Sequence, residues 1–131
     1  MVFEANYTVP KMIQKSAEEF SEIVAQYRRT KSGDFEPITY REMFQLGLDF
    51  AAALKQLGLE RGQPIGLISD NRPEWLQADI GIMSLGAIDV PRGNDATIID
   101  LEKILSLTEC KISIAENNSQ VNKILSLKDK L

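Results

Sequence analysis

Two early segments of the chain place their apolar residues at helical spacing. In residues 9–20 the apolar positions are separated by lysine, glutamine and glutamate, and residues 39–57 continue the same spacing over several turns. Thr39 and Glu42 have the spacing of a capping box at the start of the second segment. Gly58 follows where a glycine commonly ends a helix. We therefore predict two amphipathic helices in these segments.

Between these two helices the pattern changes to alternation. Residues 22–29 alternate in a way that is typical of a strand, and residues 30–34 are small and polar, as in a turn. Residues 37–39 then form a short extended segment before the capping threonine. The pattern predicts a β-hairpin with a polar loop.

The rest of the chain repeats a short apolar strand followed by a helix. Pro73 lies in the first turn of the first of these helices, where its missing N–H costs little. The predicted strands are 65–68, 87–90 and 111–115, and the predicted helices are 71–86, 97–107 and 119–131. Such alternation with short links predicts a parallel sheet. We expect the α/β fold class: a three-layer-like parallel sheet with flanking helices, plus an N-terminal β-hairpin.

The last predicted helix, 119–131, has no glycine, proline or capping residue at its end. We therefore expect residues 1–131 to form one unit that is an incomplete portion of a larger domain. An open sheet edge in such a piece would favour self-association.

The composition excludes several functions. The chain has 131 residues, of which 44% are apolar and 26% are charged, and it contains no histidine, so Ser-His and Cys-His nucleophile pairs and histidine metal sites are excluded. The net charge of -4 and the absence of a basic stripe argue against nucleic-acid binding. The one cysteine, Cys110, fits a reducing cytoplasmic setting. No apolar run is long enough to span a bilayer, although contact with a membrane surface stays open.

The carboxyl ends of the predicted strands are the best candidates for ligand contacts, since ligands of open parallel sheets bind there. They carry residues 69–71, 92–95 and 116–118, all of them polar or small. Helix caps and turns are the better explanation of the first and third. In the second, an arginine beside a glycine could meet a phosphate or carboxylate. We therefore select Arg92, Gly93 and Asn94 as candidate cofactor-binding residues.

Four other residues have structural interpretations. We interpret Trp75 as a core anchor and Cys110 as a small core residue, and Asp79 and Asp89 as buried carboxylates with hydrogen-bond or ionic partners. A catalytic role for either aspartate needs a second group, and the sequence indicates none. The glycine-rich phosphate loops of dinucleotide-binding and P-loop proteins are absent.

Four segments together resemble one enzyme family. Residues 38–43 (ITYREM) resemble the first core motif of the adenylate-forming superfamily, and residues 83–91 (MSLGAIDVP) resemble the second. The spacer 58–67 (GLERGQPIGL) and residues 69–75 (SDNRPEW) are similar to those of AMP-forming acyl-CoA synthetases of the long-chain fatty-acid CoA ligase type.

This resemblance implies a ligase that makes an acyl-adenylate from ATP and a fatty acid or other carboxylate, and then transfers the acyl group to coenzyme A, with Mg²⁺ assisting. The family's phosphate loop, catalytic lysine and metal ligand would lie beyond Leu131, so no catalytic or metal residue is assigned, and the piece alone should be inactive. Many members continue the second motif as V-P-L-[ND]-P, whereas this chain has Arg92 and Gly93 after Pro91. By position, this backbone would approach the pantetheine arm of CoA.

Two alternatives stay open at this point. The chain could belong to another class of adenylating enzyme, such as an acyl-AMP ligase. It could also be a self-contained flavodoxin-like binding or regulatory module without ligase activity.

Overall fold

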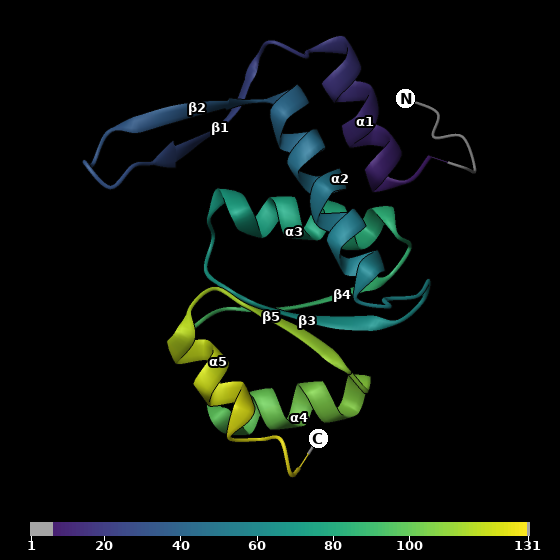
Figure 1. The fold of residues 1–131 in the computed structure, drawn as a ribbon, viewed down its shortest axis with the longest axis vertical. Coiled ribbons are helices and arrows are strands. Elements are labelled where there is room, and N and C mark those ends of the chain that lie inside the picture. The colour runs from purple at the N-terminus through teal and green to yellow at the C-terminus, as the bar shows by residue number, and fades with distance from the viewer. Residues whose placement is uncertain (1–6, 131) are drawn as a thin grey trace.

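The computed structural model of the protein describes residues 7–130, and within them the chain forms two sheets and their covering helices (Figure 1). In chain order the elements are α1 (Val9–Glu19), β1 (Val24–Arg29), β2 (Phe35–Thr39), α2 (Tyr40–Gln56), β3 (Pro64–Ile68), α3 (Pro73–Ser84), β4 (Ile88–Arg92), α4 (Ile98–Thr108), β5 (Ile112–Ala115) and α5 (Asn118–Leu125). The helices and the hairpin predicted from the sequence are all present.

The larger sheet has the strand order β4-β3-β5, with both pairs parallel. Its central strand β3 is buried from Ile65 to Ile68, as a strand covered on both faces must be. Gly66 lies where α4 and β5 approach closely, because a Cβ on it would come within 2.9 Å of Leu105 Cδ2 and 2.8 Å of Ser113 Oγ. The expected parallel sheet is therefore confirmed.

Separate apolar cores cover the two faces of this sheet, which makes the expected three-layer architecture (Figure 1). The core on the α2 and α3 side consists of Leu54, Leu59, Ile65, Leu67, Ala78, Ile82 and Ala87. The core on the α4 and α5 side consists of Ile68, Leu101, Leu105 and Leu127. Alternate residues of β3 therefore supply opposite cores, as the period of two in a strand requires.

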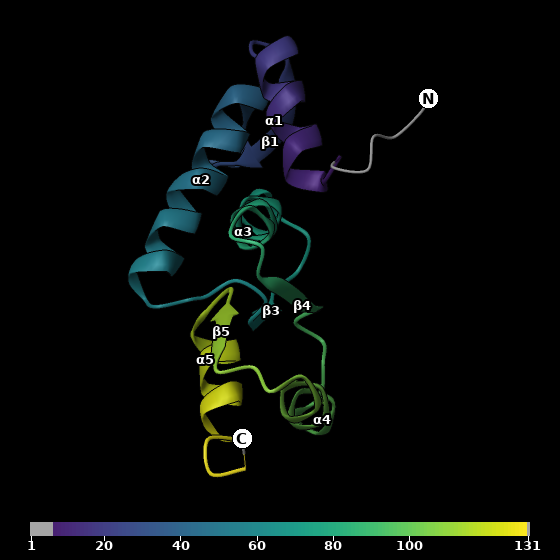
Figure 2. The same ribbon diagram turned by 90° about the vertical axis from the view of Figure 1, so that its right-hand side faces the viewer.

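Glycines let α2 and α3 cross in close contact. A Cβ on Gly47 would lie 2.5 Å from Ile80 Cγ2, and a Cβ on Gly81 would lie 2.8 Å from the backbone oxygen of Gly47. Figure 2 shows α3 end-on, between the sheet and the layer formed by α1 and α2. Ile38, Met43 and Ile80 form a third apolar cluster there.

The β-hairpin extends from the helical layer, and much of its surface is exposed (Figure 1). Tyr27 and Phe35 are 59% and 67% exposed. Arg28 and Glu36 form an ion pair of 3.0 Å across the two strands. Both partners are about half exposed, so the pair contributes little stability.

The local signals for helix α2 are confirmed. Thr39 Oγ1 accepts from the Glu42 N–H at 3.2 Å, and the Glu42 carboxylate accepts from the Thr39 N–H at 2.8 Å. Gly58 has a φ of 86°, the left-handed conformation that follows a helix end. Thr97 and Asp100 make a second capping box at α4, which we did not predict.

Several predicted boundaries were wrong, and helix α3, for example, covers Pro73–Ser84 instead of residues 71–86. Strand β4 continues through Pro91 to Arg92, because its pairing with β3 continues to Ile68. Strand β5 starts at Ile112, one residue later than predicted. Helix α5 ends at Leu125, because the following turn directs Leu127 into the core. Residue 131, the predicted end of that helix, lies outside the described residues.

Candidate functional site

The carboxyl ends of the three parallel strands send the chain to different faces of the sheet. Strand β3 leads to α3 on one face, whereas its neighbours β4 and β5 lead to α4 and α5 on the other (Figure 1). Where adjacent strands diverge in this way, a crevice opens at their carboxyl ends, and open α/β sheets bind ligands in such crevices. The three polar segments chosen from the sequence lie at these strand ends.

A hydrogen-bonded network joins all three strand ends. The Asp70 N–H donates to Glu116 Oε2 at 2.8 Å, and the Ser69 hydroxyl donates to the same oxygen at 3.3 Å. The Asn94 amide donates to Glu116 Oε1 at 3.1 Å and also to the Asp70 carboxylate. The structure thus brings together one residue or more from each polar segment that follows a strand.

Glu116 is the ionised centre of this network. The Asp70 backbone N–H, followed by the Asn94 amide, lowers the pKa of Glu116 below its ordinary value. A carboxylate that accepts several N–H donors prefers its charged form. Glu116 therefore acts here as a fixed acceptor that ties β3 to the loop after β4.

Helix α5 adds two donors to the same loop. The Gln120 side chain, which is only 6% exposed, donates to the Asn94 carbonyl at 3.1 Å. The Lys123 ammonium donates to the carbonyls of Asn94 at 3.1 Å and Ala96 at 2.8 Å. Asn94 is therefore held through its backbone and its side chain at once.

The Arg92 side chain does not join this network, and Gly93 has no side chain to contribute. The Arg92 guanidinium is exposed and donates to the neighbouring Pro91 carbonyl at 2.7 Å. Arg92 and Gly93 instead line a shallow pocket of about 450 Å³ whose other walls are Asp95, Ala96, Asp100, Lys103, Ile104 and Leu107. The three candidate residues therefore differ in their surroundings. Asn94 is held by hydrogen bonds within the protein, whereas Arg92 and Gly93 are accessible to a ligand.

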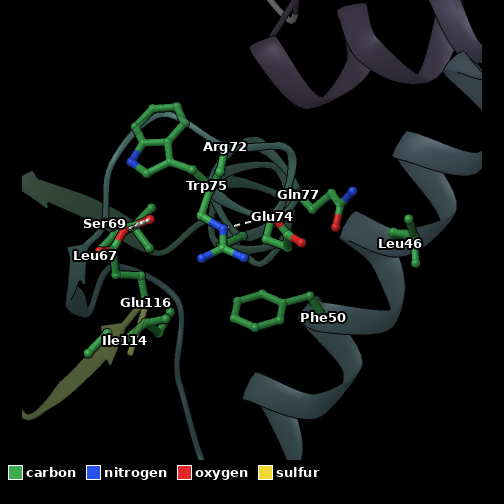
Figure 3. A pocket seen from close by; sticks show the side chains of 12 residues that line it. Leu46, Phe50, Leu67, Ser69, Arg72, Glu74, Trp75, Gln77, Ile114 and Glu116 are labelled. Carbon is green, nitrogen blue, oxygen red and sulfur yellow. Dashed lines mark hydrogen bonds and ion pairs between the residues drawn. The ribbon is translucent and has the colours of Figure 1, made fainter. Parts of the chain in front are cut away.

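An apolar cavity of about 390 Å³ opens beside the network, between α2, α3 and the ends of β3 and β5 (Figure 3). Leu46 and Phe50 come from α2, Leu67 from β3 and Ile114 from β5. Ser69, Arg72, Glu74 and Glu116 bring polar groups to its lining. An apolar cavity with a few polar groups is the usual form of a small-molecule site.

Arg72 is already paired beside this cavity. Its guanidinium donates to Glu74 Oε2 at 2.8 Å (Figure 3). This hydrogen bond raises the pKa of Arg72 and lowers the pKa of Glu74. An anionic ligand would therefore have to compete with Glu74 for Arg72.

The sequence analysis missed most of this cavity. Leu46 and Phe50 are four residues apart, so they lie on one face of α2, and that spacing was visible in the sequence. That they line one cavity with Ile114 was not visible, because it depends on how α2 crosses the sheet. Trp75, which we predicted as a core anchor, packs against the α2 and α3 core and also lines the cavity.

Asp79 on α3 and Asp89 on β4 are hydrogen-bonded to each other, so each supplies the partner that the sequence did not indicate. Burial, followed by the contact with Asp79, raises the pKa of Asp89 to about 7. Asp89 Oδ1 is buried and has no hydrogen-bond partner among residues 7–130. When two half-buried carboxylates contact each other, the state in which the pair keeps one proton is favoured.

Cys110 has the predicted structural character. It is half-buried against the α4 and α5 core, and its sulfur lies 3.1 Å from Thr108 Oγ1. Burial raises the pKa of the Cys110 thiol above its ordinary value.

Residues 7–130 contain no group of three or more cysteine, aspartate or glutamate side chains that could hold a metal ion. Among the same residues no helix has the length and apolar character that crossing a bilayer requires.

Comparison with known proteins agrees with the motifs. A profile of AMP-binding enzymes matches residues 13–131. The long-chain-fatty-acid–[acyl-carrier-protein] ligase AEE15, chloroplastic, of Arabidopsis thaliana is 33% identical over 116 residues, which are 88% of this chain and 16% of that protein. The long-chain-fatty-acid–CoA ligase ACSBG2 of Mus musculus is 28% identical over 123 residues, which are 93% of this chain and 18% of that protein. The chain thus spans less than a fifth of the length of both.

Solved structures show the same fold. The anthranilate CoA ligase AuaEII in complex with anthranoyl-AMP matches with a TM-score of 0.85 and 22% identity over 98% of this chain and 24% of that chain. The N-terminal subdomain of Klebsiella oxytoca NpsA matches with a TM-score of 0.76 and 23% identity over 85% of this chain and 27% of that chain. Together with the profile match, these findings show that the chain belongs to the AMP-binding enzyme family and has the fold of the N-terminal subdomain of adenylate-forming enzymes.

Proposed function

We propose that residues 1–131 are part of an ATP-dependent, AMP-forming ligase that activates a long-chain fatty acid and transfers it to a thiol. The observation that carries this proposal is the profile match over residues 13–131, together with fatty-acid ligases among the relatives. In the first step a carboxylate oxygen attacks the α-phosphorus of ATP and pyrophosphate leaves. In the second step the thiol attacks the acyl carbonyl, and AMP and a proton leave.

In this proposal the segment contributes binding surfaces and no reacting group. The cavity lined by Leu46, Phe50 and Ile114 would lie against an apolar part of the substrate or of the rest of the enzyme. Arg92 and Gly93, with Asn94 behind them, would face the pantetheine arm of the thiol acceptor, because they lie at a strand end and are open to a ligand. ATP and Mg²⁺ would be held by other parts of the polypeptide.

The acceptor itself has two candidates that share the pantetheine chemistry. Coenzyme A follows from the sequence motifs and from the mouse relative. An acyl carrier protein is favoured by the Arabidopsis relative, which has the higher identity of the two. The single half-buried cysteine also fits the cytoplasmic location that we propose, which cell fractionation would test.

The test is to express the full polypeptide that carries this segment and to measure ATP–pyrophosphate exchange with palmitate. We expect exchange with the full polypeptide and none with residues 1–131 alone. Thioester formation with CoA and with holo acyl carrier protein then identifies the acceptor, and Arg92→Ala should raise the KM of that acceptor. A gene that ends at codon 131, or a full polypeptide without exchange, would instead support a self-contained flavodoxin-like module.

A further inference from the structure

The loop between β4 and α4, residues 93–97, is held by side chains from three other places in the chain. Asp70 follows β3, Glu116 follows β5, and Gln120 and Lys123 belong to α5. Apart from the capping box between Thr97 and Asp100 at the start of α4, the restraint within the loop is the hydrogen bond from the Ala96 N–H to the Gly93 carbonyl at 3.2 Å. Its conformation therefore depends on these outside contacts.

Lys123 makes an unusual contribution to that restraint. None of the ion pairs within residues 7–130 includes it, whereas Lys130 pairs with Glu102 at 2.9 Å. The Lys123 ammonium instead donates to two backbone carbonyls two residues apart, those of Asn94 and Ala96. A single charged donor on both carbonyls fixes the turn between them, and charged hydrogen bonds are the stronger kind.

Gln120 supports Lys123 from the same face of α5, since residues three apart on a helix are neighbours. Asn94 receives both donors on its carbonyl, while its own N–H and side chain donate to Asp70 and Glu116. With Asn94 held inward, Arg92 and Asp95 remain exposed on the opposite side, around the shallow pocket. The hydrogen bonds that hold Asn94 inward therefore determine which side chains of the loop face a ligand.

We propose that Lys123 and Asn94 are positioning residues that lock this loop in the conformation that receives the pantetheine arm of the thiol acceptor. The inference rests on the proposed function, and it adds a device for the second step of that reaction. A surface ordered before binding lowers the entropy lost on binding, so the lock should act on affinity for the acceptor. It should act far less on adenylate formation, in which the acceptor takes no part.

The experiment compares variants of the full polypeptide. Lys123→Met keeps a long apolar side chain and removes the charge, Lys123→Arg restores a charged donor, and Lys123→Gln provides a second, milder loss. Lys128→Met is the matched control, because Lys128 is exposed and its side chain has no hydrogen bond or ion pair within residues 7–130. Each variant is measured in ATP–pyrophosphate exchange with palmitate and in thioester formation at varied acceptor concentration.

We expect Lys123→Met to raise the KM of the acceptor by about tenfold, which is the effect of losing one well-placed charged contact. Exchange should change much less, Lys123→Gln should lie between Lys123→Met and the wild type, and Lys123→Arg should recover most of the affinity. Hydrogen exchange of the amides of residues 93–97 should become faster in Lys123→Met and, to a smaller extent, in Lys123→Gln. The Lys128→Met control should match the wild type in all three measurements.

Two outcomes would overturn the positioning role of Lys123 and Asn94 without overturning the proposed function. One is an unchanged acceptor KM in both Lys123→Met and Lys123→Gln. The other is an equal loss of both half-reactions together with a lowered melting temperature, which would mean that Lys123 serves stability only. A wild-type polypeptide without any exchange activity would overturn the proposed function, and the acceptor role with it.

Discussion

The contact between Asp79 and Asp89 should make the fold less stable as the pH rises. Burial, followed by the contact with Asp79, raises the pKa of Asp89 from 3.8 to about 7, and burial also raises the pKa of Asp79. None of the ion pairs within residues 7–130 supplies a cation to either aspartate. A second negative charge on the pair therefore lowers the free energy of unfolding.

The direction of this pH effect follows from the numbers of protons that the folded and unfolded states bind. The unfolded chain releases this proton near pH 4, whereas the folded chain keeps it to about pH 7. Between these values the folded state binds more protons, so its stability falls as the pH rises. The stabilisation that the protonated pair provides is complete below about pH 4 and is lost as the pH passes through 7.

The rise in the pKa of Asp89 sets an upper limit on the change in the free energy of unfolding. A shift of about 3 pK units corresponds to roughly 4 kcal/mol at most. Asp89 is only half-buried, and water screens such a group, so we expect a loss of about 1–2 kcal/mol between pH 5 and pH 8. Urea titrations across this range would measure the free energy of unfolding directly.

Asp89→Asn isolates the cause, because the amide resembles the protonated acid and cannot ionise. We expect the advantage of this variant over the wild type to grow by about 1–2 kcal/mol between pH 5 and pH 8. Asp129→Asn, at an exposed carboxylate without hydrogen bonds in residues 7–130, should follow the wild-type curve. A wild-type stability that is flat or rises from pH 5 to pH 8, or an unchanged slope in Asp89→Asn, would refute the reasoning.

Three further results are expected. Leu127→Ala should lower the free energy of unfolding by about 2–4 kcal/mol in urea titration, because Leu127 is 1% exposed, whereas Leu125→Ala, at a position that is 59% exposed, should change it little; equal effects would contradict the burial of Leu127. Gly47→Ala should cost about 1–3 kcal/mol, because its Cβ would lie 2.5 Å from Ile80 Cγ2, and a neutral result would show that α2 and α3 can move apart. Cys110 should react with iodoacetamide at pH 7.5 more slowly than free cysteine, because its raised pKa reduces the thiolate; rapid labelling would mean that the thiol is exposed.

Local chemistry made most elements predictable. Thr39, Glu42 and Gly58 specify both ends of one helix through hydrogen bonds and backbone conformation that involve only nearby residues. The boundaries that failed depended on distant contacts. Strand β4 reaches Arg92 because Ile68 pairs with it, and α5 stops early because Leu127 finds the core.

The candidate site divides in the same way. The sequence located its polar residues, because parallel strands put their carboxyl ends at one edge of the sheet. It could not separate Arg92 from Asn94, because that depends on contacts with Glu116 and Lys123, which lie more than twenty residues away. Nor could it show that Leu46 lines one cavity with residues at the ends of β3 and β5.

The order of the elements and the family could be predicted from the sequence alone, and the ligand-binding region stays a prediction. Periodicity, helix caps and short motifs act over a few residues, so they can be interpreted without a structure. Four features depend on tertiary packing: the strand order β4-β3-β5, the cavity, the hydrogen bonds that hold residues 93–97, and the contact between Asp79 and Asp89. Each of these brings together residues from different elements, and the burial and pairing that give them their chemistry arise only when the layers pack.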